Sequence, residues 1–137
     1  MQRVVLWSCT FLICCSCGPN SLADYRAEGR AQCEALTYEL ATISDTKTLI
    51  EKASLLERHF EKLVDLMIAA RTYQIDHPDD DGGDPIDGGV QAALQEQLRR
   101  LYHLEGGREI LERVEREPLI RLDAYERSLL ANRPSSH

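Results

Sequence analysis

Residues 48–70 read TLIEKASLLERHFEKLVDLMIAA, and this stretch decides the fold. Its apolar residues recur at alternating intervals of four and three positions, at Leu49, Ala53, Leu56, Phe60, Leu63, Met67 and Ala70. That spacing places them along one face of an α-helix. Further apolar residues widen the stripe, namely Leu55, Val64, Leu66 and Ile68. A stripe of this width suits a helix packed against more than one neighbour better than a helix of a two-stranded coiled coil.

The flanking residues predict the ends of this helix. Thr48, with Glu51 three positions later, resembles a capping box and predicts the start. The dipeptide His77-Pro78 predicts the end near residue 75, because the residue before a proline is disfavoured in the α conformation. At roughly 1.5 Å per residue, the helix is expected to be about 40 Å long.

Another amphipathic helix is predicted upstream, over about residues 22–43. Its apolar positions are again spaced by threes and fours, at Leu22, Tyr25, Gly29, Cys33, Leu36, Leu40 and Ile43. Ser21 can cap its start, and residues 44–46 supply a break before the next helix.

Downstream, aspartate, glycine and proline dominate residues 76–89, which are therefore expected to form an acidic loop. Helical spacing then resumes at Val90, Leu94, Leu98 and Leu101 and continues beyond Gly106-Gly107. Pro118 fits either the first turn of a last helix or a kink.

These segments predict an all-α fold, an up-and-down bundle of three long helices with the third broken into two near Gly106 or Pro118. One domain is expected to cover residues 21–131, and residues 132–137 are expected to form a flexible tail. Alternating charges along residues 99–117 are typical of a solvated helix face.

The N-terminus has the pattern of an export signal. Arg3 precedes an apolar run over residues 4–15, which is too short for a transmembrane helix of about 20 residues. A signal-peptide core needs only about 7 to 15 residues. The sequence therefore predicts that residues 1–16 are a cleaved signal peptide.

The residues before the expected cleavage site are Leu12-Ile13-Cys14-Cys15-Ser16-Cys17. This segment resembles the lipobox of bacterial lipoprotein precursors, in which a small residue precedes a cysteine that is acylated. The resemblance implies that Cys17 is the lipidated residue and that residues 17–20 are a short tether. Cys14 departs from the usual leucine of the lipobox, and Cys15 is the alternative acceptor.

The resemblance also implies a location. Acyl chains such as palmitate would anchor the exported protein to a bacterial membrane, with the helical domain facing the periplasm or the cell exterior. The residue after the acylated cysteine is Gly18 and not the aspartate that favours inner-membrane retention, so the outer membrane is favoured.

Net charge argues against two classes of electrostatic partner, and cysteine content argues against an internal disulfide. The chain carries a net charge of −7, and losing Arg3 with the signal leaves 15 basic against 23 acidic residues. Nucleic acid and anionic headgroups are therefore not expected as electrostatic partners. Cys33 would be the only thiol of the mature chain, so no internal disulfide is expected, and its place on an apolar stripe predicts burial.

The acidic loop contains the candidate metal ligands Asp79, Asp81 and Asp84, whose carboxylates are the hard oxygen donors that calcium prefers. The loop fails the EF-hand pattern, because Gly88 occupies the position of the bidentate glutamate. A solvated linker is the favoured interpretation of this segment.

Catalytic motifs are not recognisable. The four histidines lack metal-ligand spacing, and no nucleophile elbow or phosphate-binding loop is present. The sequence thus predicts no enzyme and no cofactor. It favours a membrane-anchored lipoprotein that acts as a protein-interaction, assembly or structural component of the envelope, with an envelope or secreted protein as partner. The alternatives are an ion- or ligand-binding module using residues 77–87 and a soluble secreted helical bundle.

Overall fold

The computed structural model describes residues 18–83 and 88–131, and within these ranges every regular element is a helix. The helices are α1 (Leu22–Ala41), α2 (Thr46–Asp76), α3 (Gly88–Tyr102) and α4 (Gly107–Ala131). The predicted all-α bundle is confirmed. The predictions for residues 1–17, for Asp84 and for residues 132–137 concern positions outside the described ranges.

Both long N-terminal helices begin at a capping side chain. The Ser21 hydroxyl accepts a hydrogen bond from the backbone N–H of Asp24 at 3.1 Å, as predicted. For α2, the predicted capping box at Thr48 is wrong, because Asp45 is the cap and its carboxylate accepts from the Thr48 N–H at 2.8 Å. An aspartate caps as well as a threonine and adds a negative charge at the positive end of the helix. This N–H bond lowers the pKa of Asp45.

The third helical segment is interrupted near Gly106, as predicted, and not at Pro118. Gly106 has φ 69°, a left-handed conformation that ends the turn after α3 and lets α4 begin in a new direction. Pro118 lies inside α4, where its ring is fully buried. The prediction that Pro118 begins a last helix is therefore wrong, since core packing of the ring offsets the missing backbone hydrogen bond.

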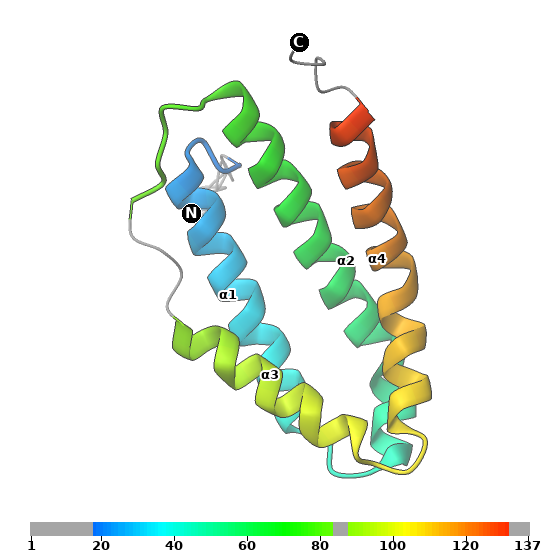
Figure 1. Ribbon diagram of the computed structural model, residues 1–137. Helices are drawn as coiled ribbons and strands as arrows, with labels where there is room; N and C mark the ends of the chain where they lie inside the picture. The colour runs from blue at the N-terminus through cyan, green and yellow to red at the C-terminus, as the bar shows by residue number, and fades with distance from the viewer. Residues whose placement is uncertain (1–17, 84–87, 132–137) are drawn as a thin grey trace, which may run out of the picture.

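The helices form an open bundle in which α2 packs on both α1 and α4 (Figure 1). Helix α3 crosses α1 obliquely and approaches α4 near the turn that joins them (Figure 1). The backbones of α2 and α3, although consecutive in the chain, do not come together. Helices α2 and α4 run in the same direction, so both end at the end of the bundle where α1 begins (Figure 1).

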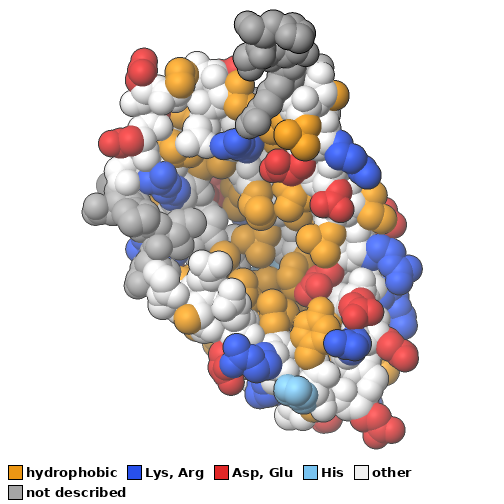
Figure 2. Space-filling model, in the orientation of Figure 1, with side chains coloured by type: hydrophobic (Ala, Val, Ile, Leu, Met, Phe, Trp, Pro, Cys, Tyr) orange, Lys and Arg blue, Asp and Glu red, His pale blue; other side chains and the backbone are white. Residues whose placement is uncertain are grey.

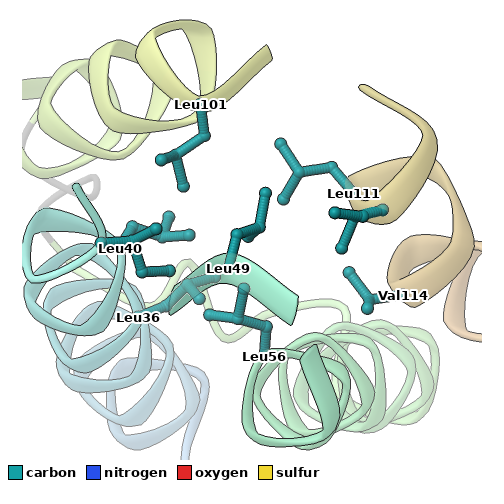
Figure 3. Packing of buried hydrophobic residues seen from close by; sticks show 9 residues of the cluster. Leu36, Leu40, Leu49, Leu56, Leu101, Leu111 and Val114 are labelled. Carbon is teal, nitrogen blue, oxygen red and sulfur yellow. The ribbon is translucent and has the colours of Figure 1, made fainter. Parts of the chain in front are cut away.

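All four helices contribute to one hydrophobic core. Leu36 and Leu40 of α1 point toward Leu49 of α2 and toward side chains of α3 and α4 (Figure 3). The buried members of this core are Leu36, Leu40, Ile43, Leu49, Leu56, Leu101, Ile110, Leu111 and Val114. Most of them lie at the end of the bundle where α1 turns into α2, and this end is therefore the closed one.

Arg100 joins α3 to the C-terminal end of α1. Its guanidinium donates to the carbonyl oxygen of Ile43 at 2.7 Å and to that of Leu40 at 2.8 Å. These carbonyls lie at the negative end of the α1 dipole, where a cation is favourable. The prediction of a solvated charged face is thus wrong for Arg100, although its neighbour Arg99 is exposed and pairs with Glu96.

Candidate functional site

An apolar trough opens at the end of the bundle where α1 begins. Its volume is about 410 Å³. The lining comes from three helices: Leu22 and Arg26 of α1; Met67, Ala70, Arg71 and Gln74 of α2; and Leu122, Tyr125 and Glu126 of α4. A band of hydrophobic side chains runs along the hollow between α4 and the pair α1 and α3 (Figure 2). We refer to these nine residues as the trough.

The trough exists because one apolar face of α2 is covered over only part of its length. Leu49 and Leu56 are 0% exposed, whereas Met67, on the same stripe, is 52% exposed. Helix α4 follows the same trend, since Leu111 is fully buried and Leu122 is half-buried. The predicted stripe is confirmed, as is the prediction of more than one neighbour, since α2 packs on α1 and α4. Its uncovered half was not predicted, because spacing alone does not tell how far each neighbour extends.

Helix α3 is shorter than α2 and contributes no residue to the trough. Helix α2 has 31 residues and α3 has 15, which correspond to about 46 Å and about 22 Å along their axes. Helix α3 packs near the closed end, and nothing among the described residues covers α2 between α1 and α4 at the other end.

Charged side chains on α1 and α4 line opposite sides of the trough. Arg26 on α1 donates to the carbonyl oxygen of Gly83 at 2.8 Å, and Glu126 belongs to α4. The Tyr125 hydroxyl shares a hydrogen bond with the Thr72 hydroxyl at 2.8 Å, which joins α4 to α2 beside the trough. The lining therefore mixes the apolar side chains of Leu22, Met67, Ala70 and Leu122 with polar or charged side chains from all three helices.

The first part of the acidic loop is mostly exposed, as predicted for a solvated linker, but Asp80 and Gly82 are packed against α1. The Asp80 carboxylate accepts from the backbone N–H of Leu22 at 3.0 Å and from that of Gly82 at 2.9 Å. These bonds lower the pKa of Asp80, and the contact with Leu22 is the larger cause. Gly82 is buried with φ 67°, so the loop turns back tightly over the first turn of α1.

Aromatic rings also join the start of α1 to the end of α2. The rings of Tyr73 and His77 stack with centroids 4.1 Å apart, and the Tyr25 ring lies 5.6 Å from that of Tyr73. Loss of solvation raises the pKa of Tyr73, with the Asp80 charge as the next cause. The start of α1, the end of α2 and the loop thus form one packed unit beside the trough.

The metal candidates do not converge in the described part of the loop. Asp79 and Asp81 are exposed, and Asp81 accepts from the backbone N–H of Gly83 at 2.9 Å. Asp84 lies outside the described residues. No group of three histidine, cysteine or acidic side chains suited to a metal occurs in residues 18–83 and 88–131. Ion binding by residues 77–87 stays a prediction without geometric support.

Cys33 and His59 are two further residues of α1 and α2. Cys33 is half-buried, where burial was predicted, and loss of solvation, followed by the charge of the nearby Glu34, raises the pKa of its thiol. His59 is half-buried, and its Nδ1 lies 2.6 Å from the Gln32 amide nitrogen. The contact between His59 and Gln32 joins α2 to α1. Neither Cys33 nor His59 lines the trough.

The proposed lipidation residues, Cys17 and its alternative Cys15, lie outside the described residues. Among the residues that are described, no helix is both long and apolar enough to cross a bilayer. Comparisons with protein families, with curated proteins and with solved structures found no match for this chain.

Proposed function

We propose that this chain is a non-enzymatic, membrane-anchored lipoprotein of the bacterial envelope whose trough docks a partner protein. The observation that carries the proposal is the apolar lining left open along α2, with Met67 52% exposed in it. Exposing that surface to water is unfavourable at about 25 cal/mol per Å². Apolar side chains gathered in one exposed hollow are the feature that supports docking there.

The lining is suited to binding rather than to chemistry. Its charged and polar members are Arg26, Arg71, Gln74, Tyr125 and Glu126. None of these is a nucleophile beside a general base, which acyl transfer or hydrolysis would require. Apolar contacts with a few orienting charges are instead the usual composition of a docking surface.

The lipobox-like segment supports a position close to a membrane. Leu22, which lines the trough, follows the proposed lipidated Cys17 by five residues. A fully extended chain of that length spans about 17 Å. Acylation of Cys17 would therefore hold the trough near the bilayer surface, within reach of membrane-embedded or membrane-bound proteins.

Intact-mass analysis of the protein from its native membrane fraction tests the anchor. Cys17→Ser is expected to lose the diacylglyceryl mass and membrane association, whereas Cys15→Ser is expected to keep both. An unmodified chain that begins near Gly18 would favour the soluble secreted alternative.

Site-specific photocrosslinking in cells tests the docking. A photoreactive residue at position 67 is expected to give a discrete crosslinked species whose partner is identified by mass spectrometry. Tyr38, which is 70% exposed and lies outside the trough, is the matched control position. Equal crosslinking at positions 67 and 38, or none at 67, would contradict a docking role for the trough.

A further inference from the structure

We draw no further inference here: the strongest candidate, the pocket of about 370 Å³ lined by Arg30 of α1, whose Nε is buried without a hydrogen-bond partner among the described residues, carries nothing because its lining ends at Gly83 and so borders residues 84–87, which lie outside the described ranges.

Discussion

Asp80 is the residue that most changes the interpretation of the acidic loop. As one of several clustered aspartates it resembles a cation ligand, yet its two carboxylate oxygens accept the N–H groups of Leu22 and Gly82. A carboxylate at the N-terminal end of a helix is stabilised by unpaired N–H groups and by the helix dipole. The loop is therefore attached to α1 by the charge that also suggested a metal site.

Asp80→Asn is expected to lower the melting temperature at pH 7. The folded-state pKa of Asp80 is lowered, so its carboxylate stabilises the fold above its ordinary pKa of about 3.9, and this contribution is lost as pH falls through the folded-state value. The difference in melting temperature between wild type and Asp80→Asn should therefore shrink at acidic pH. A difference that is constant from pH 7 to pH 2.5 would contradict this role.

Gly82→Ala is expected to destabilise the fold more than Gly83→Ala does. Both glycines have left-handed φ angles, 67° and 64°, which cost an L-residue about 1–2 kcal/mol. At Gly82 a new Cβ would also lie 2.7 Å from Leu22 Cγ, whereas at Gly83 no atom of the described residues lies within 4 Å. Urea denaturation of the two variants measures the difference. Equal free energies of unfolding would show that the loop does not press on α1.

At the scale of the element, α2 consists of a buried half and a partly exposed half that share one apolar stripe. Its N-terminal half packs in the closed end of the bundle, and its C-terminal half lines the trough. The same residue types are therefore buried in one half and partly exposed in the other, since Leu56 is fully buried and Met67 is 52% exposed.

This division predicts that shortening an apolar side chain lowers the free energy of unfolding more in the buried half of α2 than in the exposed half. Leu56→Ala is expected to lower the free energy of unfolding by about 3 kcal/mol, because Leu56 is fully buried and a cavity would remain. Met67→Ala is expected to cost less than about 1 kcal/mol and instead to weaken partner binding. Denaturant titration and photocrosslinking measure the two effects. A large stability cost at Met67 would mean that this half of α2 also serves as core.

At the scale of the whole molecule, the bundle is closed at one end and open at the other. The closed end is held by the leucine core and by Arg100, which reaches from α3 to the end of α1. The open end contains the start of α1, the end of α2 and the trough. The proposed lipid anchor precedes α1, so the open end is the one expected near the membrane.

Arg100→Met is expected to lower the free energy of unfolding by about 2 kcal/mol, because two charge-assisted hydrogen bonds to α1 are lost. Arg99→Met is the adjacent control. Arg99 forms only an exposed pair with Glu96, so its loss is expected to cost about 0.5 kcal/mol or less. Chemical denaturation distinguishes the two variants. Similar costs would show that Arg100 does not hold α3 on α1.

Much of the fold could be predicted because helix formation depends on local spacing and local side chains. The stripe from Leu49 to Ala70, the cap at Ser21 and the break at Gly106 need only a few neighbouring residues to be recognised. The cap at Asp45 was missed because Thr48 offered a competing local signal, and the continuity of α4 through Pro118 was missed because it depends on tertiary burial of the proline ring. That Leu122 and Tyr125 line the trough could not be predicted, because it depends on the placement of α4 beside α2.

Periodicity, turn residues and charge in this sequence by themselves determined an all-α chain with a central amphipathic helix, an acidic connecting loop and a lipobox-like N-terminus. Only the tertiary structure decided which part of the apolar stripe stays uncovered and which aspartate accepts the Leu22 N–H at the start of α1. The physical reason is that a helix period specifies which residues share a face. Coverage of that face depends on the length and placement of helices distant in the sequence.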